Sequence, residues 1–339
     1  MPTRRLFLGA AMVAGLVTSA RVQAAALDRG WSKWVRSYVN GGRVIDRRQD
    51  GITHSEGQGY GLLLAQAFGD RKVFTELEEW TERHLAVRQD RLMAWKWVPD
   101  PHTNIADWHN ATDGDLFRAW ALLRAERDSG WSGYRETALA IAHDIAELCL
   151  AADPRAPAEW LLVPGAEARR SPKRVLFNPS YILPRALREL GAAAGEPRLI
   201  KAAEHGETVL AELAMTGFLP NWVDVTPSGF VKPLEHDLLW GYDALRIPLY
   251  LTWSGRADHP AVGLARELME RGSIPDHLAV EASPDGQILA QSNKPGFLAL
   301  HALAHCRDVP DRRPDGSDYY SDSLLMLAQV AQREGQCKV

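Results

Sequence analysis

Apolar residues recur at intervals of three and four along most of the chain, and this periodicity constrains the fold more than any other feature. Leu116, Trp120 and Leu123 illustrate the spacing, which places apolar side chains on one face of an α-helix. Alternating segments predict only short strands, at residues 92–98, 174–177 and 288–291. The predicted helices cover residues 28–40, 56–69, 73–86, 113–127, 133–151, 183–194, 197–214, 237–253, 259–272, 295–305 and 320–333.

The helical segments follow one another without a Gly/Ser/Pro-rich linker from residue 25 to residue 339. The chain has 339 residues, of which 46% are apolar, enough to build one sizeable core. We therefore predict a single all-α domain over residues 25–339, either a closed helical toroid or a large irregular bundle. Periodicity alone does not choose between these two. Residues 331–339 lose the apolar pattern, which predicts a frayed end.

Residues 1–24 have the composition of a targeting segment. Arg4 and Arg5 precede an apolar run over residues 6–17, and small residues follow up to Ala24. This order is typical of a twin-arginine signal peptide, and the run is too short for a permanent membrane anchor. We expect cleavage near Ala24 to Ala26 and a periplasmic or secreted protein. An ordinary Sec signal or an uncleaved anchor is the alternative.

The charge of the chain argues against nucleic acid and anionic lipid as partners. The formal net charge is -4, and residues 1–24 hold three arginines and no acid, which leaves -7 for the rest (-4 minus 3). A mildly acidic exported protein without a basic patch has no electrostatic attraction to phosphate. We expect a neutral partner, and no stable membrane span once the signal is removed.

Cysteines and histidines do not predict a metal or cofactor site. Three cysteines cannot form a complete disulfide framework. Cys149 lies in an apolar helical run and is expected to be buried, while Cys306 and Cys337 could pair. His301 and His305 are interpreted as polar helix positions, as is His236 beside Asp237.

The segment Ser55-Glu56-Gly57-Gln58-Gly59-Tyr60-Gly61 places an acid at the start of a predicted helix, between glycines. Ser55 and Gln58 can form a capping box. Each glycine costs about 0.5–1 kcal/mol of backbone order relative to alanine, so we expect a ligand to approach the backbone here. Glu56 could otherwise only complement the helix dipole.

Two further segments carry acids in comparable settings. In Ala111-Thr112-Asp113-Gly114-Asp115, Thr112 and Asp115 can form the capping box, which leaves Asp113 free for another role. In residues 240–248, Asp243 lies among apolar residues, three positions before Arg246, with which it can pair. Pro248 is expected to kink or end that helix.

The aromatic content suggests the class of ligand. The chain has 12 tryptophans, several of them near the acids or in loops, and aromatic faces suit the apolar faces of sugar rings, although core packing accounts for others. Acids without a basic patch, metal cluster or nucleotide-binding loop fit glycoside hydrolysis. That reaction needs one protonated carboxyl group and one carboxylate.

Four segments, in order along residues 55–248, resemble glycoside hydrolase family 8 and its bacterial endoglucanases associated with cellulose synthesis. They are residues 55–61, residues 111–115, Phe177-Asn178-Pro179-Ser180-Tyr181 and residues 241–248. Arg118 and Ser129 depart from the signature of the family, in positions that concern helix packing.

The resemblance implies an (α/α)6 barrel that hydrolyses β-1,4-glucosidic bonds of cellulose or a related β-glucan with inversion. It makes Glu56 the general acid and Asp243 the general base, with Asp113 binding the sugar at the cleavage subsite and helping to hold the water. A sugar chain lying against the start of the first acidic helix would explain its glycines, and burial beside Asp113 would keep Glu56 protonated. The expected substrate-binding residues are Tyr60, Trp108, Tyr181, Tyr242, Arg246 and Trp240.

Other functions are compatible with the same residues. The polymer could be xylan or chitosan, or the chain could be a catalytically weak glycan-binding subunit of a synthase complex. A cellulose synthase complex is a possible partner.

Overall fold

The computed structural model describes residues 29–335 and residue 337. The predicted signal peptide, residues 1–24, lies outside the described residues. Within the described part of the chain, no helix is both long and apolar enough to cross a membrane.

Helices are the main secondary structure of the described residues and confirm ten of the predicted segments to within a few residues. In chain order they are residues 29–38, α2 (Ser55–Ala67), α3 (Arg71–His84), α4 (Thr112–Arg127), α5 (Arg135–Leu148), α6 (Pro184–Ala194), α7 (Pro197–Met215), α8 (Ile247–Trp253), α9 (Pro260–Met269), α10 (Pro295–Ala304) and α11 (Tyr319–Arg333). Three 3-10 turns are η1 (Arg47–Gln49), η2 (Pro179–Tyr181) and η3 (Ala244–Arg246).

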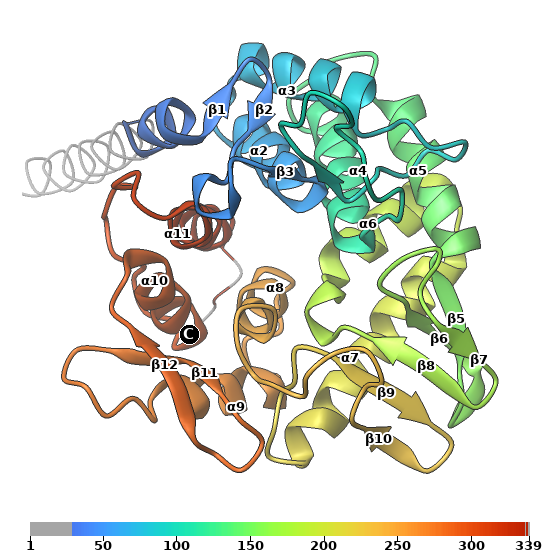
Figure 1. The fold of residues 1–339 in the computed structure, drawn as a ribbon, viewed down its shortest axis with the longest axis vertical. Coiled ribbons are helices and arrows are strands. Elements are labelled where there is room, and N and C mark those ends of the chain that lie inside the picture. The colour runs from blue at the N-terminus through green and yellow to red at the C-terminus, as the bar shows by residue number, and fades with distance from the viewer. Residues whose placement is uncertain (1–28, 336, 338–339) are drawn as a thin grey trace, which may run out of the picture.

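Six of the helices form a closed ring. Helices α2, α4, α6, α8, α10 and α11 contact one another in that order, and α11 returns to α2 (Figure 1). Almost every residue of α2, α4, α8 and α11 is buried, as expected for helices covered on all sides. The helix at 29–38 and helices α3, α5, α7 and α9 bury one stripe each against this ring. The fold is therefore an (α/α)6 barrel, and the irregular bundle is excluded.

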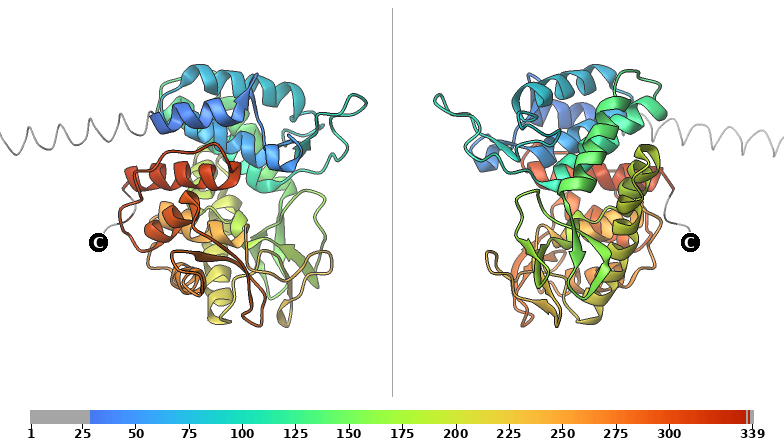
Figure 2. Two further views of the ribbon diagram at one scale, coloured as in Figure 1. Left: turned by 60° about the vertical axis from the view of Figure 1, so that its left-hand side comes forward. Right: turned by 90° about the vertical axis from the view of Figure 1, so that its right-hand side faces the viewer.

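Short antiparallel strands connect the helices. They are β1 (Val39–Asn40) with β2 (Arg43–Val44), β3 (Thr53–His54) with β4 (Lys96–Trp97), β5 (Leu150–Asp153) with β6 (Ala156–Leu162), β11 (Leu278–Ala282) with β12 (Ile288–Ser292), and a four-stranded sheet of β7 (Arg170–Ser171), β8 (Arg174–Phe177), β9 (Val223–Thr226) and β10 (Gly229–Val231). The predicted strands at 174–177 and 288–291 are present, whereas 92–98 contains only β4. In both views of Figure 2 most strands and long loops gather on the side of the ring away from the end of α11, drawn in red.

The predicted helix over residues 237–253 is wrong in its first half. Trp240 forms a β-bridge with Ala282, and the Asn221 side chain accepts hydrogen bonds from the N–H groups of Gly241 (3.0 Å) and Ala244 (2.9 Å). These tertiary contacts hold residues 240–244 outside the helix. Pro248 lies in the first turn of α8, where a missing N–H costs nothing, so it begins the helix rather than ending it.

The glycines of α2 serve helix packing and not ligand approach, which corrects the sequence interpretation. A Cβ on Gly59 would lie 2.6 Å from the Cβ of Phe117 on α4. A Cβ on Gly57 would lie 2.9 Å from the Tyr319 hydroxyl on α11, and one on Gly61 would lie 2.9 Å from Val44. Glycine is therefore required because three neighbouring elements approach α2 closely.

Neither predicted capping box forms. The N-cap residues of α2 and α4 make no side-chain cap hydrogen bond. Gln58 instead accepts from the Val44 N–H at 2.6 Å, and the Thr112 hydroxyl donates to the Val163 carbonyl at 2.8 Å. Both side chains thus tie the helix starts to neighbouring segments of the barrel.

Ion pairs explain an unusual residue, Arg118, and hold the end of α11. Arg118, where the family signature prefers an apolar residue, is buried and pairs with Glu78 at 2.5 Å. Of the segment predicted to fray, residues 331–333 belong to α11 and Glu334 is held by side-chain contacts, while residues 336, 338 and 339 lie outside the described residues. Glu334 pairs with Arg124 and Arg185 and accepts a hydrogen bond from the Trp253 indole at 2.8 Å. Cys306 and Cys337 form a disulfide, and Cys149 is a buried free thiol.

We predict that Gly59→Ala lowers the free energy of unfolding by about 1–3 kcal/mol, because the new methyl group collides with Phe117. Helix propensity alone would make the same change stabilising by about 1 kcal/mol. Gly263→Ala in α9 is the matched control, since the nearest atom to its new Cβ is the Arg266 Nη2 at 3.8 Å. Urea unfolding of both variants separates the effects, and a stabilised Gly59→Ala protein would contradict the packing role.

Candidate active site

The starts of several ring helices converge on one pocket with a volume of about 520 Å³. Glu56 comes from the first turn of α2, Asp113 from the first turn of α4, and Asp243 and Arg246 from the turn before α8. Lys294 and Asp318 are the N-cap residues of α10 and α11. Helix N-termini carry partial positive charge, so the barrel directs several such ends at its acidic residues.

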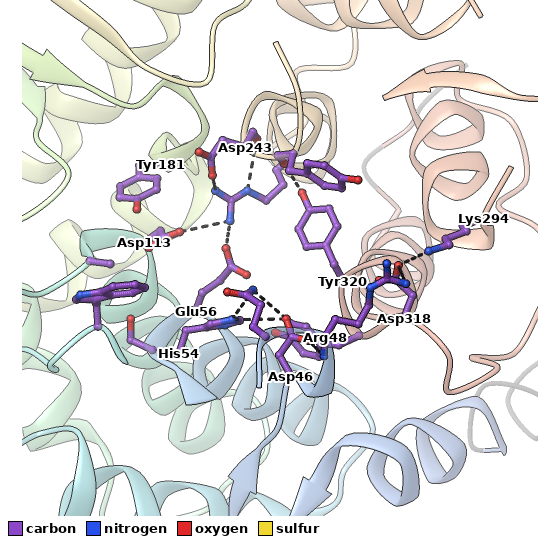
Figure 3. A pocket seen from close by; sticks show the side chains of 17 residues that line it. Asp46, Arg48, His54, Glu56, Asp113, Tyr181, Asp243, Lys294, Asp318 and Tyr320 are labelled. Carbon is purple, nitrogen blue, oxygen red and sulfur yellow. Dashed lines mark hydrogen bonds and ion pairs between the residues drawn. The ribbon is translucent and has the colours of Figure 1, made fainter. Parts of the chain in front are cut away.

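One guanidinium joins the three predicted acids. Arg246 Nη2 lies 2.6 Å from Asp243 Oδ1, and Nη1 contacts both Glu56 Oε2 and Asp113 Oδ2, the latter at 3.4 Å. Figure 3 shows Asp243 on one side of this group and Glu56 and Asp113 on the other. The arginine side chain is buried, and Nη2 also donates to Ser180 Oγ at 2.9 Å.

The pKa values of two of the three carboxyl groups around the guanidinium are raised. Burial, the charge of Asp243 and that of Asp115 raise the pKa of Asp113 to about 8, although the Gly114 N–H and the Tyr181 hydroxyl favour its ionised form. Burial also raises the pKa of Asp243 to about 6, against hydrogen bonds from Asn178 and Trp222. Together, Asp113 and Asp243 therefore retain one proton near neutral pH, and Asp243 is largely ionised.

The exposures of the three acids differ. The side chain of Asp243 is 30% exposed and that of Glu56 19%, whereas Asp113 is only 4% exposed. Asp243 and Glu56 are thus open to water or a ligand in the pocket, and Asp113 lies deeper against the barrel core.

Tyrosines and a histidine surround the acids. Tyr181 and Tyr242 line the pocket, and Tyr242 is half exposed, with the Tyr320 ring packed edge-on at 5.5 Å. Tyr60 lies behind Arg246, fully buried, with its hydroxyl 2.5 Å from that of Tyr250. It can position Arg246 but does not line the pocket. Burial lowers the pKa of His54, which keeps that ring neutral beside Glu56.

Two predicted substrate-binding tryptophans do not line the pocket. Trp240 is fully buried in the hydrophobic core, because its segment is bridged to β11. The prediction that it binds substrate is wrong for this arrangement. Trp108 is 52% exposed in the loop between β4 and α4 but does not line the pocket. Tyr181, Tyr242 and Arg246, which are also predicted to bind substrate, line the pocket.

Sequence reasoning missed the half of the pocket that faces Glu56 across the opening. Asp318 binds Lys294 and lies 3.7 Å from Arg48. One signal for Asp318 was present in the sequence. It precedes an apolar helix, and its side chain caps that helix by accepting from the Ser321 N–H at 3.1 Å, so it too is an acid at a helix start.

We predict that Asp113→Asn stabilises the protein increasingly as pH rises from about 4 to about 8. In the unfolded chain an aspartate releases its proton near pH 3.9, whereas folded Asp113 keeps it up to about 8. Over this window rising pH favours the unfolded state of the wild type, and asparagine removes that effect. The gain at pH 8 is at most about 5 kcal/mol, the value to which a pKa rise from about 3.9 to about 8 corresponds, and urea unfolding measures it.

Asp153→Asn is the control with the opposite sign. Although Asp153 is buried, His205 and Arg155 hold the pKa of its carboxyl group well below its usual range. Ionised Asp153 therefore contributes stability that is lost in acid. Its asparagine variant should be less stable than wild type at neutral pH, with a deficit that shrinks as pH falls below about 4. A pH-independent difference for Asp113→Asn would show that its carboxyl group is not protonated in the fold.

Comparison with known proteins supplies the family. The family model for glycosyl hydrolases family 8 matches residues 6–334. A probable endoglucanase of Novacetimonas hansenii is 28% identical over 92% of this chain and 93% of the relative. An endoglucanase of Cellulomonas uda is 30% identical over 72% of this chain and 68% of the relative.

Similar solved structures point to the same family. Endoglucanase Cel10, a family 8 glycosyl hydrolase from Klebsiella pneumoniae, superposes with a TM-score of 0.83, 26% identity and coverage of 90% of this chain and 99% of that one. Endo-β-1,4-glucanase CMCax from Acetobacter xylinum superposes with a TM-score of 0.79 and 28% identity, and the match covers 92% of this chain and 99% of that one. The barrel gathers three acids in one pocket, and the family model matches nearly the whole chain. This protein therefore belongs to glycosyl hydrolase family 8.

Proposed function

We propose that this protein is an endo-acting β-1,4-glucanase that cleaves its substrate with inversion at the anomeric carbon. Glu56 is the general acid, Asp243 is the general base, and Asp113 binds the sugar at the cleavage subsite and helps to hold the water. The convergence of these three acids on Arg246 within one open pocket is the observation that carries the proposal. The endoglucanases among its relatives supply the substrate class.

The charge state of the cluster suits acid–base catalysis. Asp243 is ionised above about pH 6 and partly exposed, as a base that activates water must be. The acid must be protonated, and the proton retained in the cluster lies next to Glu56, because Glu56 and Asp113 contact the same nitrogen of Arg246. The proposal requires this proton to reside on Glu56 when a glucan is bound.

Aromatic side chains near the acids favour a sugar polymer. Tyr242 presents a half-exposed ring to the pocket, and Tyr181 lies beside Asp113. Trp222 packs edge-on against Tyr181 at 6.2 Å and stacks on His236 at 4.1 Å. Such rings offer flat apolar faces to pyranose units, whose hydroxyl groups would meet the polar pocket wall.

We further propose that the protein acts outside the cytoplasm, in the periplasm or as a secreted enzyme, on β-glucan made by a cellulose synthase. The N-terminal sequence supports export. The Cys306–Cys337 disulfide supports it as well, because such bonds persist in oxidising compartments. The link to cellulose synthesis rests on the resemblance of the motifs.

We predict that Glu56→Gln lowers the turnover of carboxymethylcellulose by about 10²–10⁴-fold, because the leaving oxygen loses its proton donor. Released reducing ends measure the effect. Glu76→Gln on α3 is the matched control, since Glu76 is exposed on the outside of the barrel, where it pairs with Lys72, one turn earlier, at 3.9 Å. Equal rates for Glu56→Gln and wild type would remove Glu56 from the mechanism.

The pH dependence of kcat/KM is expected to be bell-shaped. Activity should rise with pH through about 6 as Asp243 ionises, and fall through about 8 as the remaining proton leaves the cluster. Initial rates on a soluble cello-oligosaccharide across pH 4.5 to 9.5 test this. A profile with no acidic limb would contradict the assignment of Asp243 as the base.

A further inference from the structure

Two histidines and a glutamate meet where α9 and α10 end. His301 lies in the last turn of α10, and His305, four residues further on, is the C-cap residue of the same helix, while Glu270 directly follows α9. The Nε2 atoms of both rings contact the same oxygen, Glu270 Oε1, at 2.9 and 2.8 Å, and lie 3.2 Å from each other. Both helices lie side by side in the lower left of Figure 1.

This spacing is close to that of metal ligands. Zinc binds histidine nitrogen at about 2.0–2.1 Å and carboxylate oxygen at about 2.0–2.2 Å, in tetrahedral geometry, which puts ligand atoms about 3.3–3.4 Å apart. The three atoms form a triangle with sides of 2.8, 2.9 and 3.2 Å. Each would need to move by only a few tenths of an ångström for an ion above their plane to contact all three.

We propose that Glu270, His301 and His305 form a binding site for a divalent transition-metal ion of the zinc class, with the fourth position open to water. Imidazole nitrogen suits zinc, cobalt and nickel, whereas calcium and magnesium prefer an all-oxygen ligand set. Sequence reasoning treated the two histidines as polar helix positions, because the third ligand is 31 residues away from the first histidine and only the packing of α9 on α10 brings it near.

The site is separate from the acidic pocket. Lys294, which lines the pocket, caps the opposite end of α10 from His305. Cys306, the residue after His305, is joined to Cys337 by the disulfide. A bound ion would therefore fasten α9 to the end of α10, where the C-terminal segment is already attached, and would act on stability rather than on the cleavage step.

Zinc binding to the metal-free full-length protein, followed by calorimetry and by elemental analysis after dialysis, tests the proposal. We expect one zinc ion per chain in the wild type and at least about tenfold weaker binding in His301→Ala and in His305→Ala. His143→Ala is the matched control, because His143 contacts Glu196 at 2.8 Å without a second histidine in that pair. It should bind zinc as the wild type does.

Two further readouts exclude a merely structural effect of the substitutions. Zinc should raise the unfolding temperature of wild type and of His143→Ala, but not that of His301→Ala, while kcat on carboxymethylcellulose stays the same in all three. Cobalt(II) bound to the wild type should give the intense visible absorption of a tetrahedral site. No zinc retained by wild type, or equal retention by His301→Ala, would overturn the proposal.

Discussion

The pocket depends on a single buried guanidinium. Arg246 lies at the bottom of the pocket with only 2% of its side chain exposed, and its two terminal nitrogens contact Glu56, Asp113 and Asp243. Burying carboxylates without such a partner is strongly unfavourable. The barrel can therefore gather acids from α2, α4 and the turn before α8 only because this cation is held among them.

The position of Arg246 is itself the product of packing far along the chain. Asn221 fixes the turn at residues 241–244, and the Trp240 bridge to β11 keeps the preceding segment extended. Ser180, from the turn after β8, accepts a hydrogen bond from the guanidinium. On the other side of the barrel, Glu334 ties α11 to Arg124 of α4 and to Arg185 of α6. Ring closure and pocket assembly thus rely on the same inner helices.

Local sequence predicted much of the fold because most helices bury a regular apolar stripe, and their bounds differ from the expected ones by only a few residues. It failed where tertiary contacts overrode local pattern. Residues 237–246 have helical periodicity, yet Asn221 and Ala282 hold their first part extended. The glycines of α2 suggested a ligand, because a sequence does not reveal that Phe117 and Tyr319 approach them.

The same distinction applies to the site. Glu56, Asp113 and Asp243 were recognisable because acids at helix starts or among apolar residues need a reason. Trp240 was misassigned because its place next to an acid in the sequence does not reveal that the side chain is buried. Asp318 and Lys294 were missed because their ion pair joins the starts of two different helices. The raised pKa of Asp113 likewise depends on burial and on Asp243, which lies 130 residues further along the chain.

The central claim is that Asp243 acts as a base through water, across the guanidinium from Glu56, and not as a nucleophile. An inverting enzyme needs room for that water between its two carboxyl groups, and Asp243 and Glu56 contact different nitrogens of Arg246. The anomeric configuration of the first product from a cello-oligosaccharide, followed by proton NMR before mutarotation, tests this most directly. The account predicts that the α-anomer appears first, whereas initial release of the β-anomer would contradict it.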